Sequence, residues 1–270
     1  MNAVLPFLPR ADEGEGFHAP TLGEFFPEVF LFEGTPFEIN RIIMVRLIAA
    51  AALILLFWIG TSRMKIVPGR FQSVIELGIG FVRKNIGEDL LGRRDGERFL
   101  PVLTTIFFMV FALNVTGVIP FLNIAGSSLI GVPLVLAAVA YITFIYAGIK
   151  ARGGKFFKDA LFPPGVPKPL YILLTPIEFL STFVLRPVSL TLRLLMNMVV
   201  GHLLLVLCFA ATNFFFTSGA IDGVARLIGG GTLAFGFFFT LFELLVAVLQ
   251  AYIFTLLTAV YIQLAVSEEH

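Results

Sequence analysis

Residues 189–205 read SLTLRLLMNMVVGHLLL, a run apolar enough to cross a membrane that nevertheless contains an arginine, an asparagine and a histidine. An arginine at the centre of a membrane helix costs about 2.5–3.5 kcal/mol on insertion scales. No acidic residue lies near Arg193 in the sequence to neutralise it. Because ionisable residues inside membrane segments usually mark functional sites, the stretch predicts a membrane helix that carries a functional charge.

The composition extends this prediction to the whole chain. Of its 270 residues, 58% are apolar and 14% are charged, whereas soluble domains are about 45–50% apolar and about 25% charged. Apolar runs near the ~18–20 residues that span lipid recur along most of the chain, and the alternation typical of membrane β-barrels is absent. The predicted fold class is therefore an all-α, multi-span membrane protein. The single cysteine, Cys208, excludes an internal disulfide and a multi-cysteine metal site.

About five membrane-crossing helices are predicted. The first three cover approximately residues 42–60, 99–120 and 129–149. The last two apolar tracts, residues 169–216 and 227–266, are too long to cross upright, because a helix of ~45 residues is ~65 Å long and the hydrocarbon layer is ~30 Å thick. Each is either a hairpin of two short spans or one long, strongly tilted helix. The absence of a Gly-Pro turn at the middle favours a tilted or bent helix, with Pro176 and Pro187 as expected kink positions.

The charged stretch between the first two spans, residues 61–99, carries an apolar stripe. The stripe consists of Phe71, Val74, Ile75, Leu77, Ile79, Phe81 and Val82. Such a pattern predicts an amphipathic helix that lies along the membrane surface.

Basic residues set the expected orientation. Eight lie between the first two spans and five between the third span and the first long tract: Arg63, Lys65, Arg70, Arg83, Lys84, Arg93, Arg94 and Arg98, then Lys150, Arg152, Lys155, Lys158 and Lys168. By the positive-inside rule these loops are cytoplasmic, which places the N-terminus outside and the C-terminus inside. Residues 1–41 then form an extracytoplasmic segment and residues 42–270 a single transmembrane domain. Arg41 and Arg46, at the outer end of the first span, are the exception, and we expect them to reach interfacial water along their own side chains.

Few ionisable side chains remain within the long apolar tracts. They are Glu178, Arg186, Arg193, His202 and Glu243. Arg193 either pairs with Glu178 or Glu243 inside the chain, or meets a carboxylate of another molecule. A guanidinium keeps its proton, so Arg193 is a fixed cation and not a proton relay.

Helical spacing assigns the polar residues to faces. At ~100° per residue, Asn197 lies about 40° from Arg193, whereas His202 points to the opposite side. His202 is either a proton carrier or an imidazole bonded to a neighbouring helix. Glu243, which shares a face with Gln250, is either a relay carboxylate or the satisfied partner of His202 or Arg193. In the second span, Asn114 is a weaker candidate, because an asparagine there can simply bond a neighbouring helix.

Four stretches together resemble a known family. They are VPGRFQSVIELGIGFV (67–82), FALNVTGVIP (111–120), RPVSLTLRLLMNMVVGHLLL (186–205) and LQAYIFTLLTAVYIQLAVSEEH (249–270). They are similar to subunit a of the bacterial F-type ATP synthase, occur in that family's order and cover most of the chain after residue 36. The second, third and fourth stretches contain Asn114, Arg193, Asn197, His202 and Gln250.

The resemblance implies a stator subunit of a rotary motor in the bacterial plasma membrane. Its partners would be the c-subunit ring, the b subunits of the peripheral stalk, the rest of the ATP synthase and membrane lipid. Two offset half-channels would carry protons to and from carboxylates of the ring, coupling proton flow to ATP synthesis. The subunit would be non-catalytic by itself and would hold no cofactor, metal, nucleotide or nucleic acid.

The resemblance also implies roles for individual residues. Arg193 corresponds to the essential arginine, Asn197 to the asparagine one turn later, and Gln250 to the glutamine that faces the arginine from the last helix. Asn114 matches a polar position of the outer half-channel, and Gly117 stands where some relatives have an acid. His202 and Glu243 depart from the best-known bacterial pattern, in which the acid and the imidazole are exchanged. Weaker candidates for the cytoplasmic half-channel are Glu178 and Ser189.

Two other classes of protein fit the sequence less well. A secondary ion-coupled transporter predicts internal repeats and paired helices broken at mid-membrane, and the chain shows no such repeat. GGKFF, residues 153–157, lacks the Ser/Thr and the earlier glycine of a phosphate-binding loop, which argues against a nucleotide-binding enzyme.

Overall fold

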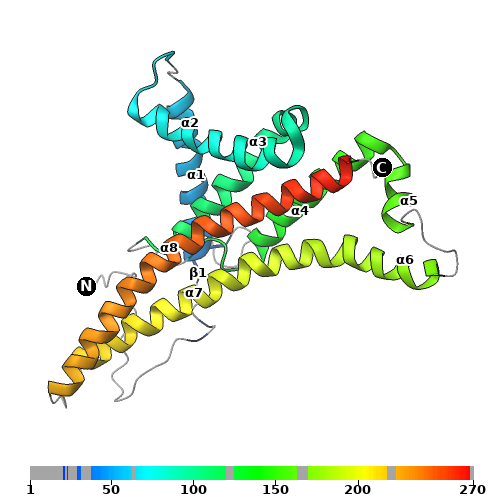
Figure 1. Ribbon diagram of the computed structural model, residues 1–270. Helices are drawn as coiled ribbons and strands as arrows, with labels where there is room; N and C mark the ends of the chain where they lie inside the picture. Colours follow the sequence, from blue (N-terminus) through cyan, green and yellow to red (C-terminus); the bar gives the residue numbers. More distant parts are fainter. Residues whose placement is uncertain are drawn as a thin grey trace.

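The computed structural model describes residues 21, 23, 29–31, 38–62, 65–119, 125–162, 170–217 and 223–267. Five of the described helical segments are long and apolar enough to cross a membrane: Arg41–Ser62, Arg70–Val115, Gly131–Arg152, Tyr171–Thr217 and Arg226–Val266. The prediction of an all-α, multi-span membrane protein is confirmed (Figure 1). Most of residues 1–41, together with Arg63, Pro120 and Lys168, lie outside the described residues, so the proposed extracytoplasmic segment stays a prediction.

A small sheet precedes the first helix. Strands β1 (Val29–Leu31) and β2 (Ile39–Asn40) pair antiparallel, in a segment where no strand is predicted. Helix α1 (Arg41–Ser62) begins directly after Asn40, whose Oδ1 accepts a hydrogen bond of 2.9 Å from the backbone N–H of Ile43. This bond satisfies one of the N–H groups that a helix leaves without an internal partner at its start.

The predicted amphipathic helix is α2 (Arg70–Val82), which continues through the π-helical segment η2 (Arg83–Glu88) into α3 (Asp89–Val115). Gly92 interrupts α3 with a φ of 72°, a conformation that favours glycine. Near this turn Gly87 and Gly96 approach so closely that a Cβ on Gly96 would lie 2.7 Å from the carbonyl carbon of Gly87. The chain therefore reverses direction between the charged segment and the apolar part of α3.

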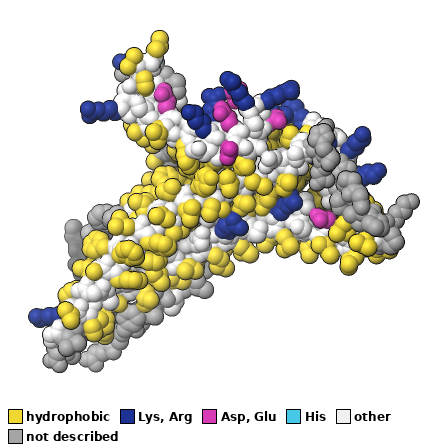
Figure 2. All heavy atoms as spheres, viewed as in Figure 1, with side chains coloured by type: hydrophobic (Ala, Val, Ile, Leu, Met, Phe, Trp, Pro, Cys, Tyr) yellow, Lys and Arg dark blue, Asp and Glu magenta, His cyan; other side chains and the backbone are white. Residues whose placement is uncertain are grey.

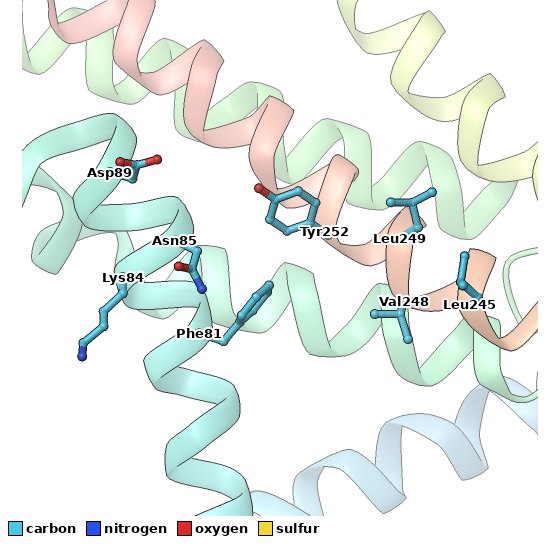
Figure 3. A pocket seen from close by; sticks show the side chains of 8 residues that line it. All are labelled: Phe81, Lys84, Asn85, Asp89, Leu245, Val248, Leu249 and Tyr252. Carbon is cyan, nitrogen blue, oxygen red and sulfur yellow. The ribbon is translucent and has the colours of Figure 1, made fainter.

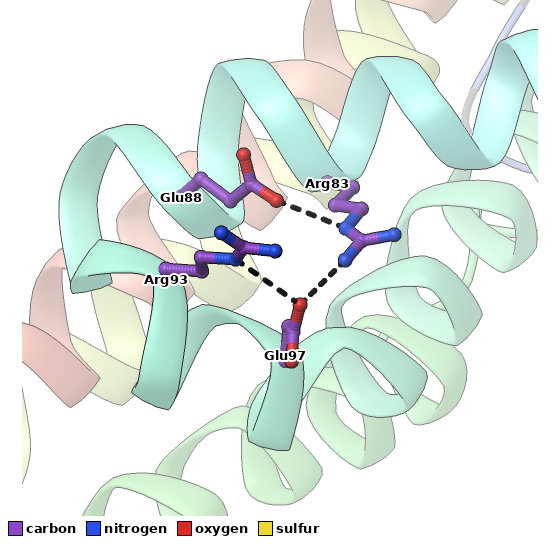
Figure 4. Close-up of polar contacts among 4 residues, drawn as sticks. All are labelled: Arg83, Glu88, Arg93 and Glu97. Atoms are coloured by element: carbon purple, nitrogen blue, oxygen red, sulfur yellow. Dashed lines mark hydrogen bonds and ion pairs between the residues drawn. The ribbon is translucent and has the colours of Figure 1, made fainter.

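Charged side chains on the outer side of this turn pair with one another (Figure 4). Arg83 Nε lies 2.9 Å from Glu88 Oε1, and Arg83 Nη2 lies 2.5 Å from Glu97 Oε1. Arg93 Nε adds a longer contact of 3.8 Å to Glu97. Within the stripe, Ile75 and Val82 are buried, whereas Phe71, Val74 and Leu77 are exposed. An exposed apolar stripe beside paired charges is the pattern expected of a helix at a membrane surface.

The remaining helices are α4 (Gly131–Arg152), the short α5 (Lys155–Leu161), α6 (Tyr171–Phe179), π-helical η4 (Leu180–Leu185), α7 (Arg186–Thr217) and α8 (Gly223–Val266). Neither long tract contains a hairpin, so the prediction of two over-long helices is confirmed. The 44 residues of α8 extend over ~66 Å, about twice the ~30 Å of hydrocarbon, and the helix must therefore cross obliquely. The other tract bends along its length (Figure 1), and its π-helical segment begins four residues after Pro176, which cannot donate a backbone hydrogen bond.

Two predicted boundaries are wrong by several residues. The second span ends at Val115 and not near residue 120, because the chain turns there to meet residues 125–128. Helix α8 begins at Gly223, before residue 227, and includes the three glycines 229–231. One of them, Gly229, is buried beside Phe215 and Phe216 of α7 and permits close helix approach there, whereas Gly230 and Gly231 are exposed.

The core forms where α3, α4, α7 and α8 meet. It includes Leu103, Ile106 and Val110 of α3, Ala137, Ala140 and Phe144 of α4, Leu190 and Leu194 of α7, and Ala251, Phe254, Ala259 and Ile262 of α8. Small alanines on α8 let the neighbouring helices approach closely. Hydrophobic side chains cover the outer surface of α8, while Lys and Arg side chains gather on the side that carries α2 and α3 (Figure 2).

Candidate functional site

Helices α7 and α8 pack antiparallel (Figure 1), and polar residues meet between them. Thr212 Oγ1 donates to Thr232 Oγ1 at 2.9 Å, and Asn197 Nδ2 donates to Gln250 Oε1 at 2.8 Å. Between these two contacts, Gly201 of α7 faces Glu243 of α8. We call Asn197, Gly201, His202, Glu243 and Gln250 the polar seam.

Arg193 projects from the exposed face of α7. Within the part of the chain that the structure describes, its guanidinium makes no hydrogen bond or ion pair. Glu178 precedes it by 15 residues in one helical tract, which separates them by ~22 Å along the axis. Glu243 lies beside Gly201, which is ~12 Å along α7 from Arg193. Of the two alternatives left by the sequence, an internal ion pair is therefore not formed among the described residues.

Asn197 and Gln250 join the two helices one turn from Arg193. Asn197 lies on the exposed face, as Arg193 does, while Gln250 is only 2% exposed. The Nε2 of Gln250 is buried and has no acceptor among the described residues. A buried amide donor without a partner is costly, so this end of the seam favours a water molecule or another hydrogen-bond acceptor.

Glu243 is buried against the backbone of α7. Its side chain is 3% exposed, and its Oε2 has no hydrogen-bond partner among the described residues. A Cβ at Gly201 would lie 2.8 Å from Glu243 Oε1, so the carboxyl occupies space that only glycine leaves free. No described ion pair joins Glu243 to His202 or Arg193. The Glu243 carboxyl therefore lies in the polar seam without a cationic partner among the described ion pairs.

His202 follows Gly201 and is buried, on the opposite side of α7 from Arg193, as the helical spacing predicts. Arg41, at the start of α1, acts electrostatically on the imidazole. The structure thus brings His202 toward the first span, a contact that periodicity within α7 does not reveal.

Asn114 belongs to a separate buried group at the end of α3. Its Oδ1 accepts a hydrogen bond of 2.6 Å from Ser127 Oγ, and its Nδ2 has no acceptor among the described residues. Thr116 Oγ1 accepts from the backbone N–H of Gly126 at 3.1 Å. These bonds hold residues 125–128 against the end of α3. Among the described residues, no hydrogen bond joins Asn114 or Ser127 to the polar seam.

Arg46 stabilises the same turn. Its Nε donates to the carbonyl of Gly126 at 2.7 Å, and its Nη2 lies 3.5 Å from the carbonyl of Leu129. The expectation that Arg46 reaches interfacial water stays a prediction. The structure adds that two of its donors face backbone carbonyls 80 or more residues away in the sequence. Sequence reasoning also missed Ser127, Thr116 and Gly201, since none of them is ionisable.

The two weaker candidates lie toward the other end of the first long tract. Glu178 is partly exposed in α6, and Ser189 is exposed and donates to the carbonyl of Arg186 at 3.1 Å. Between them, the Arg186 guanidinium lies over the rings of Phe144 and Tyr261, 5.8 and 5.4 Å from their centroids. Among the described residues, no cluster of three or more His, Cys, Asp or Glu side chains could hold a metal ion.

Known proteins are similar to this chain over nearly its whole length. Residues 43–263 match the family described as ATP synthase A chain. A Rhodococcus erythropolis protein named ATP synthase subunit a is 52% identical over 263 residues, which cover 96% of this chain and 94% of that protein. Proteins of the same name from Frankia alni and Pseudarthrobacter chlorophenolicus are 38% and 34% identical, covering 96% and 95% of this chain and 88% and 95% of their own lengths.

Proposed function

The chain belongs to the ATP synthase A-chain family and is a multi-pass, proton-translocating membrane subunit of an ATP synthase, and we propose that Arg193 is the fixed cation that meets the carboxylates of a rotating c-subunit ring. The observation that carries this proposal is the exposed position of Arg193 without an internal counter-ion among the described residues. An unpaired charge is expensive beside lipid. A carboxylate supplied by a neighbouring subunit would neutralise it each time one passes.

The polar seam is proposed to line the outer half-channel. Protons would enter from outside through a crevice lined by Asn114, Asn197, His202, Glu243 and Gln250. Support comes from the burial of Asn114, His202, Glu243 and Gln250, together with the unpartnered Glu243 Oε2, Gln250 Nε2 and Asn114 Nδ2. Buried polar atoms without protein partners are the places where ordered water binds, and such water can pass a proton along. A ring carboxylate neutralised there could turn into lipid at low cost.

Proton release follows from the same fixed charge. A protonated ring carboxyl that reaches Arg193 from the other side meets a cation that favours its ionised form, so the proton leaves into a cytoplasmic half-channel. Glu178 and Ser189 are proposed to line this exit. Arg193 also repels a proton passing directly between the two channels. Each proton that leaked between the two channels would dissipate about 2.3 kcal/mol for every ~100 mV of membrane potential.

The proposed orientation has the N-terminus outside and the C-terminus in the cytoplasm. It is supported by the basic side chains gathered beside α2 and α3 (Figure 2) and by the positive-inside rule. The ring would lie against the exposed face of α7 that carries Arg193, and b subunits would hold the subunit as part of the stator. No feature of the described helices favours a secondary ion-coupled transporter, which would require repeated half-helices broken at mid-membrane.

Substituting Arg193 by alanine in the assembled ATP synthase tests the proposal. We expect ATP-driven proton pumping into inverted membrane vesicles to be abolished, while the complex still assembles. Lys158→Ala, which removes an exposed cation of α5, is the matched control and should pump normally. Normal pumping by the Arg193→Ala complex would refute the assignment.

A further inference from the structure

A groove of about 760 Å³ lies between the α2–η2 segment and α8. It is lined by Phe81, Lys84, Asn85, Asp89, Leu245, Val248, Leu249 and Tyr252. Figure 3 shows that the two kinds of side chain are segregated. The polar residues lie at one end, the aliphatic residues of α8 lie at the other, and the two aromatic rings lie between them.

The charges at the polar end are free of internal partners. Lys84 and Asp89 are exposed, and neither takes part in an ion pair among the described residues. Their neighbours in the same turn, Arg83 and Glu88, are paired (Figure 4). One side of the turn therefore satisfies its own charges, while Lys84 and Asp89, at the edge of the groove, carry one unpaired cation and one unpaired anion among the described residues. The Lys84 side chain extends away from α8 in Figure 3, and its exposed, flexible stem allows the amine to reach a headgroup at the edge.

The other end of the groove is a stripe of α8. Leu245, Val248 and Leu249 are 59%, 45% and 47% exposed, and their spacing of three and four residues places them on one face of the helix. This face continues directly from the charged end through Phe81 and Tyr252 (Figure 3). The groove thus has the polarity of a molecule with a charged head and an apolar tail.

The charge of the groove favours a lipid over an apolar partner helix. Such a helix would cover Lys84 and Asp89 without pairing them, which is unfavourable. A zwitterionic headgroup offers a phosphate to the lysine and an ammonium to the aspartate.

We propose that this groove binds one zwitterionic glycerophospholipid of the phosphatidylethanolamine class, with its phosphate at Lys84, its ammonium at Asp89 and an acyl chain along Leu245, Val248 and Leu249. The segment that binds the headgroup is the charged turn before α3, and the segment that binds the chain is the middle of α8. The lipid would thereby join the surface helix to the longest membrane helix. This inference is independent of the role of Arg193.

Photolabelling of the purified ATP synthase in dodecyl maltoside tests it. The probe is phosphatidylethanolamine with a diazirine in one acyl chain, and labelled peptides are mapped by mass spectrometry. We expect label on the peptide that contains residues 245–252, and excess unlabelled phosphatidylethanolamine should remove it. Lys84→Glu and Asp89→Lys should each reduce this label about three- to fivefold, as expected for loss of one exposed ion pair. Lys158→Glu, a charge change in α5 away from the groove, should leave it unchanged.

Two further measurements make the outcome decisive. A phosphatidylglycerol probe, which has the phosphate but no ammonium, should label residues 245–252 about three- to fivefold less. The double variant Lys84→Asp with Asp89→Lys restores both charges in exchanged positions and should recover most of the label. Equal labelling by both probes, label spread evenly over the exposed faces of α7 and α8, or no response to Lys84→Glu in an assembled complex would overturn the proposal. So would cross-linking of the groove to another subunit in place of lipid.

Discussion

Replacing Gly201 by alanine probes the most closely packed point of the polar seam. The new Cβ would lie 2.8 Å from Glu243 Oε1, whereas ordinary contacts begin at 3.4 Å. The carboxyl must therefore retreat by ~0.6 Å or α7 and α8 must separate by a similar amount. Because Glu243 Oε1 is the far end of a flexible side chain, the cost falls at the lower end of the range for overpacking, about 1 kcal/mol. If that penalty falls on the position of the relay carboxyl, proton transfer slows by about fivefold.

The assay is ATP-driven proton pumping by the whole ATP synthase reconstituted in liposomes, with assembly checked by subunit stoichiometry. A second substitution separates a positioning effect from general damage. Glu243→Asp shortens the side chain by one methylene, so Gly201→Ala combined with Glu243→Asp should pump faster than Gly201→Ala alone. Gly236→Ala is the matched control, because its Cβ would meet Phe209 and Cys208 of α7 at ordinary distances of 3.4–3.5 Å.

Two results would refute this reasoning. Pumping by Gly201→Ala at the rate of Gly236→Ala would show that the carboxyl does not need its present place. No recovery with the aspartate in an assembled complex would show that the defect of Gly201→Ala does not act through Glu243.

Three further predictions concern the contacts around the site. The loss of pumping in the double variant Asn197→Ala with Gln250→Ala should differ from the sum of the losses in the two single variants by about 0.5–1.5 kcal/mol, the coupling expected for their hydrogen bond. Strictly additive losses would contradict a direct bond. Asn114→Ala removes the acceptor of Ser127 and should lower the stability of the complex by about 1–3 kcal/mol in thermal unfolding, and an unchanged midpoint would show that the bond does not contribute. Glu97→Gln removes both ion pairs of that residue (Figure 4). Because the pairs are half-exposed, the stability of the complex should fall by less than ~1 kcal/mol, and the difference from the unchanged protein should vanish in ~1 M salt. A loss of stability that does not depend on salt would indicate a different cause.

Much of the fold is contained in the hydropathy of the sequence. The five crossing segments follow from runs of apolar residues, and the oblique course of α8 follows from its length alone. The sequence also predicts which residues share a face of α7, because the rotation of ~100° per residue separates His202 from Arg193 and Asn197. These features depend on residues close together in the chain.

The remaining features depend on contacts between distant residues. Periodicity assigns Glu243 and Gln250 to one face of α8 but does not give the register of α8 against α7, which the Asn197–Gln250 bond fixes. The bond from Arg46 to Gly126 joins residues 80 positions apart. In the sequence Gly201 is one small residue within an apolar run. Only the packing of α7 against α8 reveals that its missing side chain makes room for a carboxyl.

The most direct test of the account is the distance from the Arg193 guanidinium to the nearest carboxylate in a structure of the assembled, membrane-embedded ATP synthase. We predict that a carboxylate of the ring lies within ~4–6 Å, the range over which an opposite charge favours ionisation. A guanidinium bound to an acid of its own chain, or turned away from every neighbouring subunit, would contradict the account.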